Sequence, residues 1–276
     1  MKESPTLLEM LQAGVHFGHK SSRWHPKMKP YIFGERNNIH IINLEITAQK
    51  LKEAMDFVRN IAASGGVVIF IGTKAQAKEI IKKHSLDCGM PFVNSRWLGG
   101  TFTNFKTIKS VLDKFKSLKA QKASGALEKY TKKEQSEFKK EIEKLDGLVG
   151  GIENLAKLPE AVFIIDAKME KTAIYEASKK NVPVVGICDT NINPDDLDYP
   201  IPGNDDAVKS IELLVGLMAE AIKEGKTEYN AKRGIAIEKA EPKEIEIPPT
   251  SELMKVKEEN ASDTDDKEDK NQQPAN

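Results

Sequence analysis

Three short apolar runs predict the interior of a sheet. Residues 67–71 (VVIFI), 161–165 (AVFII) and 183–187 (PVVGI) are rich in β-branched side chains and show no polar alternation. Strands that are apolar on both faces are typical of a parallel sheet covered by helices on its two sides. The pattern therefore predicts three strands at the centre of one such sheet.

Amphipathic helical patterns alternate with these runs along the chain. Strand–helix alternation predicts an α/β fold with a doubly wound, mostly parallel sheet flanked by helices. Helices are expected at about 46–63, 75–83, 170–180 and 206–223, and shorter strands at 31–33 and 39–42.

Residues 103–147 interrupt this alternation with two helical stripes. Apolar side chains recur every three or four residues over 105–118 and again over 138–145, as they do on amphipathic helices. Thr131 and Glu134, before the second stripe, have the spacing of a capping box. Two facing stripes with no strand between them predict an inserted antiparallel coiled-coil hairpin. Its first arm, some 18 residues long, would span about 27 Å.

The chain therefore divides into three parts. Its 276 residues are enough to bury a sizeable core. We assign residues 1–102 and 148–225 to the sheet domain and residues 103–147 to the hairpin. Residues 226–276 hold nine basic and thirteen acidic side chains and several prolines. Such a segment cannot bury a core, so we expect a disordered charged tail.

The formal charge is zero, with 42 basic and 42 acidic residues, but the charges are distributed unevenly. Residues 74–119 hold ten Lys or Arg against three acids, and residues 13–44 hold five against one. A basic body of this kind is typical of contact with nucleic acid. A solvated lysine-rich surface explains the charge equally well, so charge alone does not decide the function.

Several classes of protein are disfavoured by the sequence. Its apolar runs fall short of the roughly 18 residues that a membrane span needs, and its acidic start is unlike a secretory signal. Cys88 and Cys188 form neither a redox motif nor a disulfide framework, so we expect reduced thiols in a cytoplasmic protein. Zinc-enzyme and serine-hydrolase motifs are missing, which argues against catalysis.

Basic residues at turns are candidates for phosphate contact. Lys74 follows the first predicted strand in a Gly-Thr-Lys turn, where it could hold a phosphate or could simply be an exposed lysine. Arg23-Trp24 and Arg96-Trp97 contain the two tryptophans of the chain. A guanidinium beside an indole can pair with a phosphate while the ring stacks on a base. Packing in the core or at a domain interface is the interpretation we favour for both rings.

Acidic side chains follow several of the predicted strands, where doubly wound sheets bind ligands. Together with a histidine they could ligate a divalent ion. Helix capping is the competing interpretation, and it suits Asp205 before the last helix. Because no spacing fixes the ligands together, we predict no metal and no cofactor. The alternative metal site would use His16, His19, Asp166, Asp189, Asp205 and Asp206.

Seven longer segments occur in order over about residues 4–225. They are LLEMLQAGVHFGHK (7–20), WHPKMKPYIFGERNNIHIINLE (24–45), FIGTK (70–74), FVNSRWLGGTFTNFKT (92–107), LVGGIENL (148–155), VFIIDA (162–167) and VVGICDTNINPDDLDYPIPGNDDA (184–207). Together these segments resemble the S2 family of small-subunit ribosomal proteins in its bacterial form. Motifs of this length and irregularity are specific.

The resemblance implies a structural constituent of the small ribosomal subunit that acts in translation in the cytoplasm and is not an enzyme. Members of the family lie between the head and body of the subunit, contact ribosomal RNA and neighbouring proteins, and help to recruit the messenger-binding protein S1. The resemblance implies neither a membrane nor a small-molecule substrate. From the matching motifs and the charge we expect RNA-backbone contacts from Arg23, Lys27, Lys29, Lys74, Arg96, Lys106 and Lys109.

Two other classes give distinct expectations. A nucleotide or sugar-phosphate enzyme would use Lys74 and the aspartates, and a phosphorylated small molecule would raise its melting temperature. A protein adaptor that works through the hairpin would have no affinity for RNA at physiological salt.

Overall fold

A parallel sheet forms the centre of the computed structural model, which describes residues 5–239 and their side chains as far as residue 234. Within that part, the strands of this sheet lie in the order β5-β4-β6-β7-β8, and all neighbours run parallel. In chain order this is 2-1-3-4-5, which confirms the doubly wound arrangement. The strands are β4 (Val68–Ile71), β5 (Phe92–Val93), β6 (Ala161–Ile164), β7 (Val184–Cys188) and β8 (Tyr199–Pro202).

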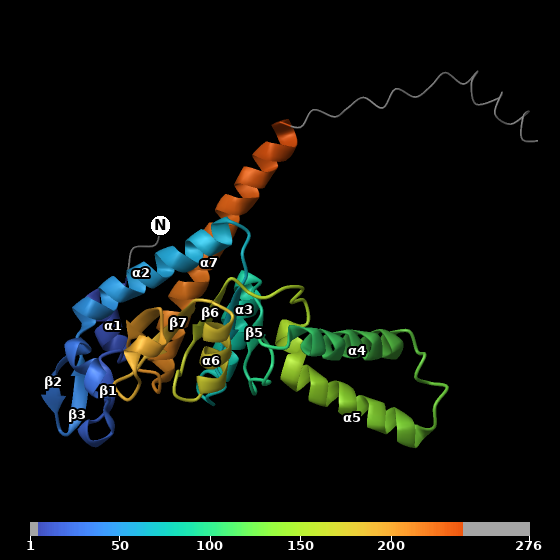
Figure 1. The fold of residues 1–276 in the computed structure, drawn as a ribbon, viewed down its shortest axis with the longest axis horizontal. Coiled ribbons are helices and arrows are strands. Elements are labelled where there is room, and N and C mark those ends of the chain that lie inside the picture. The colour runs from blue at the N-terminus through green and yellow to red at the C-terminus, as the bar shows by residue number, and fades with distance from the viewer. Residues whose placement is uncertain (1–4, 240–276) are drawn as a thin grey trace, which may run out of the picture. The chain divides into compact units, whose positions relative to one another are not determined.

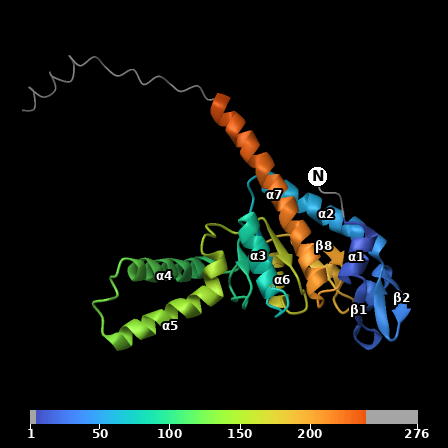
Figure 2. The same cartoon turned by 180° about the vertical axis from the view of Figure 1, so that it is seen from behind.

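Helices cover both faces of this sheet. The face carrying Phe70 and Phe163 packs against α2, α3 and α7, and Figure 2 looks onto α3 and α7. The face carrying Ile69 and Ile164 packs against α6, which lies in front of the strands in Figure 1. No helix within residues 5–239 combines the length and the apolar character needed to cross a membrane. These helices are α2 (Leu44–Ala63), α3 (Lys78–Cys88), α6 (Lys171–Lys179) and α7 (Val208–Lys239).

A small antiparallel sheet, in the order β1-β3-β2, precedes the central one. Its strands are β1 (Phe17–Lys20), β2 (Ile32–Arg36) and β3 (Ile39–Ile42), of which the sequence predicted the last two. Asn37 and Asn38 join β2 to β3 with φ angles of 55° and 59°. Asparagine tolerates this left-handed conformation better than most residues, which suits it to a tight hairpin turn.

The hairpin of residues 103–147 is present as two helices, α4 (Phe105–Ala123) and α5 (Lys132–Val149). They lie between β5 and β6 in the chain and extend to one side of the sheet (Figure 1). Thr131 and Glu134 form the predicted capping box at the start of α5. Apolar residues of both stripes are buried in the cluster that continues into the sheet. A coiled-coil register between the two helices stays a prediction.

The last helix, α7, is longer than predicted. It continues to Lys239, whereas the sequence analysis ended it near residue 223 and expected disorder from residue 226. Residues 226–239 contain no proline and several good helix formers, and the next proline is Pro242. The rest of the expected tail, residues 240–276, lies outside the described residues.

Two further strands and one α-helix of the described residues were not predicted. β8 contains two prolines, which remove backbone donors and are tolerated because β8 is an edge strand. β5 has only two residues and leaves no periodic signal. A short helix, α1 (Leu7–Ala13), begins at a capping box in which Thr6 and Glu9 each accept a hydrogen bond from the other's backbone amide.

The crossing of α7 over α2 requires a glycine. A Cβ on Gly225 would lie 2.3 Å from the backbone oxygen of Arg59. We expect Gly225→Ala to lower the free energy of unfolding by about 1–3 kcal/mol through overpacking, as measured by urea denaturation. Gly147→Ala in α5 is the control, because its Cβ would meet nothing within 4 Å; it should stabilise the protein by up to about 1 kcal/mol. Equal responses would contradict the close helix crossing.

Candidate nucleic-acid interface

The predicted strand-end residues do come together, but as a network of ion pairs. Lys74 follows β4, and its Nζ lies 2.8 Å from Asp205, 2.5 Å from Asp206 and 3.6 Å from Asp166. Burial alone would lower the pKa of Lys74, but the carboxylates outweigh it and raise that pKa. Asp205 is only 1% exposed. Its burial, with Asp189 and Asp166 nearby, raises its pKa to about 7 despite Lys74.

This network fills the edge of the sheet where doubly wound folds bind ligands. The turn that carries Lys74 is itself held by Glu170, whose carboxylate accepts a hydrogen bond from the Thr73 amide at 3.2 Å. The ammonium group of Lys74 is therefore committed to carboxylates of its own chain. An RNA contact by Lys74 stays a prediction, and it would require a phosphate to displace these internal partners.

Asp205 does not cap the last helix, contrary to the sequence interpretation. In the turn before that helix, Asn204 Oδ1 accepts hydrogen bonds from the amides of Asp206 and Ala207 at 2.8 and 3.1 Å. Asp205 is turned inward to Lys74 at 2.8 Å. The sequence could not reveal this, because the lysine that holds Asp205 lies 131 positions earlier in the chain.

One group of the alternative metal ligands is close enough to share an ion. Atoms of His19, Asp205 and Asp206 lie within 4.8 Å of one another. Asp189 contacts the same histidine, with His19 Nδ1 at 3.1 Å from its carboxylate, and this hydrogen bond raises the pKa of His19. His16 is not part of that group, and burial lowers its pKa. Elemental analysis of the purified protein distinguishes a metal site from a set of ion pairs.

The first group of predicted RNA contacts is exposed on an anchored segment between β1 and β2. Arg23, Lys27 and Lys29 all face solvent, and we call them the N-terminal basic surface. Between them, Met28 is fully buried, and the His25 amide donates to the Thr190 carbonyl at 2.7 Å. Buried anchors of this kind hold the cations on a fixed backbone.

Two side chains of this segment, Lys27 and Trp24, make contacts within the protein while remaining accessible to solvent. Lys27 lies 2.5 Å from Asp195, which raises the pKa of the lysine through a hydrogen bond. Both partners are exposed, so the pair is weak and a phosphate could replace the aspartate. Trp24 is partly exposed and its ring packs against His40 at a centroid distance of 5.2 Å.

The second group lies on the segment that leads from β5 into the hairpin. Arg96, Lys106 and Lys109 are exposed, and we call them the hairpin-base surface. Trp97, next to Arg96, is buried and meets Phe102 edge-to-face at 4.8 Å. The packing interpretation of Trp97 is therefore confirmed.

A buried carboxylate of α6 organises this same segment. Glu176 accepts hydrogen bonds from the amides of Gly100, Phe102 and Thr103 at 2.6, 2.9 and 3.3 Å, and from Trp97 Nε1 at 3.5 Å. Burial alone would raise the pKa of Glu176, but these donors outweigh it and lower that pKa. No local sequence pattern reveals this role of Glu176, because its partners lie more than seventy positions earlier in the chain.

The first helix of the hairpin exposes lysines beyond the two expected to contact RNA. α4 holds six lysines and one acid. Two of these lysines are paired, Lys114 with Glu141 at 2.6 Å and Lys119 with Glu153 at 2.7 Å. Lys116 and Lys122 are exposed like Lys106 and Lys109. The one-sided composition of residues 105–123 was a signal for them.

Exposed apolar side chains gather at the N-terminal end of the fold. Leu8 is 62% exposed and Phe33 78%, and with Leu7 and Leu11 they line a groove of about 510 Å³ between α1 and the small sheet. We call these four residues the apolar surface. Clustered exposed apolar residues mark contact sites for other proteins more often than isolated ones do.

The fold and these surfaces define a class of protein, a doubly wound scaffold with two groups of exposed basic side chains. At the sheet edge where such folds bind ligands, it carries a network of its own ion pairs. Residues 10–225 match the family model described as Ribosomal protein S2. The small ribosomal subunit protein uS2 of Geotalea uraniireducens (strain Rf4) is 50% identical over 236 residues, which is 86% of this chain and 92% of that protein. The chain belongs to the ribosomal protein S2 family. It is a structural, non-enzymatic protein of the small ribosomal subunit.

Proposed function

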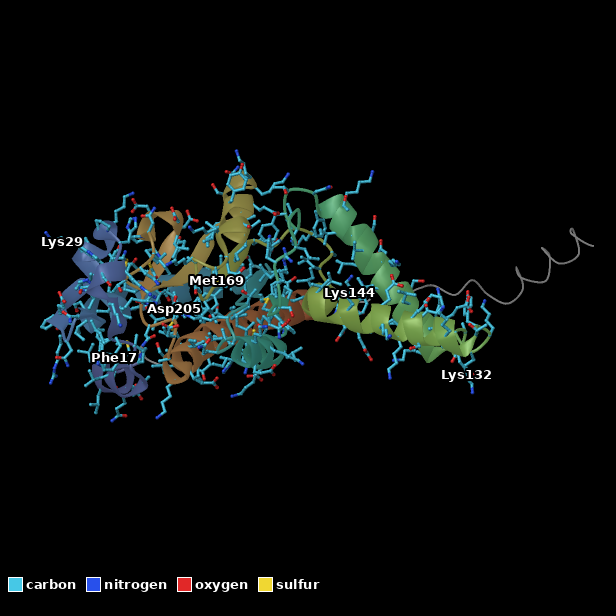
Figure 3. The ribbon with its side chains drawn as sticks, turned by 90° about the horizontal axis from the view of Figure 1, so that it is seen from below. Phe17, Lys29, Lys132, Lys144, Met169 and Asp205 are labelled. Carbon is cyan, nitrogen blue, oxygen red and sulfur yellow. The ribbon has the colours of Figure 1, made fainter. Side chains whose placement is uncertain are left out.

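We propose that this protein is held in the small subunit by ribosomal RNA at two separate places, the N-terminal basic surface and the hairpin-base surface. The observation that carries the proposal is the placement of exposed cations on anchored backbone at two distant parts of the unit. Figure 3 shows Lys29 near one end, Lys132 and Lys144 of the hairpin toward the other, and Asp205 of the internal ion-pair network between them.

RNA in an A-form helix offers mainly its phosphates and its shape to a protein. Affinity for it comes largely from neutralising phosphates and releasing counterions, so it falls as salt rises. The sheet domain, residues 1–102 and 148–225, would present the N-terminal basic surface. The hairpin-base surface would lie where the hairpin, residues 103–147, leaves that domain. Two contacts on one chain raise each other's effective concentration, so each can be weak by itself.

The test of this proposal is incorporation into small subunits that lack the protein. We expect the added full chain to co-sediment with these subunits and to dissociate from them progressively in a high-salt wash. In a cell lysate it should be found with small subunits in the cytoplasmic fraction. Binding that does not change between low and high salt would contradict phosphate recognition. Complete failure to sediment with the RNA-containing particle would favour a protein adaptor instead.

We also propose that the apolar surface receives a neighbouring protein between the head and body of the subunit, and that this neighbour is S1, the partner implied by the family resemblance. Leucine and phenylalanine side chains that stay exposed lose water contact when a partner covers them, which is favourable at about 25 cal/mol per Å² of apolar area. The groove of about 510 Å³ beside them gives an apolar anchor of the partner a place to insert.

Substitution of the apolar surface tests this second contact. We expect Leu8→Ser with Phe33→Ser to weaken capture of purified S1 by at least about tenfold, as hot-spot residues do, while incorporation into the small subunit is unchanged. Met169→Ser with Tyr175→Ser is the matched control, since these side chains are 64% and 62% exposed elsewhere on the sheet domain. Equal loss in both double variants would contradict a specific site.

A further inference from the structure

The segment that carries the hairpin-base surface is not held by a side-chain cap at the start of its helix. Asn104 precedes α4, and within the described part of the chain it makes no side-chain capping bond to that helix. The backbone just before it turns through two glycines, with Gly100 at a φ of 91°. A stretch of this kind is conformationally permissive unless something outside it fixes its amides.

Glu176 supplies that external fixation. Its Oε1 accepts from Gly100 at 2.6 Å and its Oε2 from Phe102 at 2.9 Å, so both oxygens of the carboxylate hold the same loop. The side chain is only 4% exposed and comes from α6, which packs on the sheet. A charged acceptor makes hydrogen bonds roughly twice as strong as neutral ones, and more so away from water.

We propose that Glu176 is a positioning residue for RNA binding. It ties the loop of residues 97–103 to the sheet domain and so fixes where Arg96 and Lys106 stand relative to the N-terminal basic surface. This inference rests on the proposed function, because the geometry matters only if both surfaces meet the same RNA. Glu176 itself is covered by the loop.

The physical basis is the geometry required for two-point binding. The gain from linking two contacts depends on whether both can engage at once, and it disappears when the geometry forbids it. Freeing the loop leaves every lysine and arginine in place and changes only their arrangement. The affinity should therefore fall although the number of exposed cations is unchanged.

The experiment is a double-mutant cycle on the full chain, with affinity for small subunits depleted of this protein as the measurement. Glu176→Gln keeps the size of the side chain but turns an NH₂ donor toward backbone donors. We expect it to weaken binding about tenfold, and we expect Lys106→Ala to have a clearly smaller effect in the Glu176→Gln protein than in the native one.

A spectroscopic readout shows whether the loop has moved. In a Trp24→Phe background Trp97 is the remaining tryptophan, and release of the loop should shift its emission to longer wavelength. Glu176→Asp keeps the charge and shortens the side chain, and it should give an intermediate shift and an intermediate affinity. This second variant keeps the test decisive if Glu176→Gln folds poorly.

Thr47→Val is the control for a merely structural loss. Thr47 is buried and donates to the Pro202 carbonyl at 2.8 Å, between α2 and β8 and away from the loop. It should lower the melting temperature without changing RNA affinity or Trp97 emission. If Lys106→Ala weakens binding equally in the native and Glu176→Gln proteins, the positioning role is overturned and the RNA interface stands. If Lys106→Ala has no effect in the native protein, the proposed RNA interface is overturned, and the positioning role falls with it.

Discussion

Replacing Arg96, Lys106 and Lys109 together by alanine is expected to weaken binding to depleted small subunits by about 10²–10³-fold at 0.1 M salt, with the difference vanishing near 1 M. Each lost phosphate contact lowers the magnitude of the negative slope of log K against log salt concentration by about 0.7–0.9. Three contacts therefore lower it by about 2 to 3. The measurement is a binding isotherm at four or more salt concentrations.

Lys52→Ala, Lys82→Ala and Lys209→Ala together form the control. These lysines are exposed on α2, α3 and α7, which cover the face of the sheet opposite to the one where Trp97 and Phe102 pack. Their loss changes the net charge by three, as does the loss of Arg96, Lys106 and Lys109. Long-range attraction alone would make the two triple variants equivalent. A specific interface requires that the hairpin-base variant alone shows the reduced salt dependence.

The central sheet could be predicted because its signals are local. β4, β6 and β7 are buried at every position, so their apolar runs needed no knowledge of the rest of the chain. The stripes of α4 and α5 are equally local. β8 was missed since its residues read as a proline-rich loop, and only pairing with β7 makes them a strand.

The partners of the charged residues could not be predicted in the same way. Lys74 and Asp205 are 131 positions apart, and the sequence gives each of them an ordinary local role, as a turn lysine and a helix cap. Glu176 resembles any other charged residue of an amphipathic helix, although it is buried under a loop from another part of the chain. The exposure of Arg96, Lys106 and Lys109 follows from the local composition alone, and their contact with RNA stays a prediction.

Replacing Lys74 by alanine is expected to lower the free energy of unfolding by about 3–5 kcal/mol, the range found when one partner of a buried ion pair is removed. Lys74 is the cation that Asp166, Asp205 and Asp206 share. Without it, the carboxylate of Asp205 stays buried with acidic neighbours and without compensation. Urea denaturation at pH 8, with a chelator present so that no stray cation substitutes for the ammonium group, measures the loss.

The loss should depend on pH in a definite direction. The pKa of Asp205 is already raised to about 7, and removing Lys74 raises it further. A carboxyl group whose folded pKa lies above its unfolded value favours folding at low pH, and that contribution is lost as the pH rises through the folded pKa. The deficit of Lys74→Ala should therefore be larger at pH 8 than at pH 5, by up to about 1.4 kcal/mol for the one unit by which pH 8 exceeds the native pKa.

A second substitution separates repulsion from lost packing. Adding Asp205→Asn to Lys74→Ala removes the buried charge, so we expect it to relieve the pH-dependent part of the deficit at pH 8 and to change little at pH 5. Lys83→Ala, which breaks an exposed pair with Glu212, should cost less than about 1 kcal/mol at either pH. A deficit that is independent of pH, and that Asp205→Asn does not relieve, would show that Lys74 contributes through its aliphatic chain rather than through its charge.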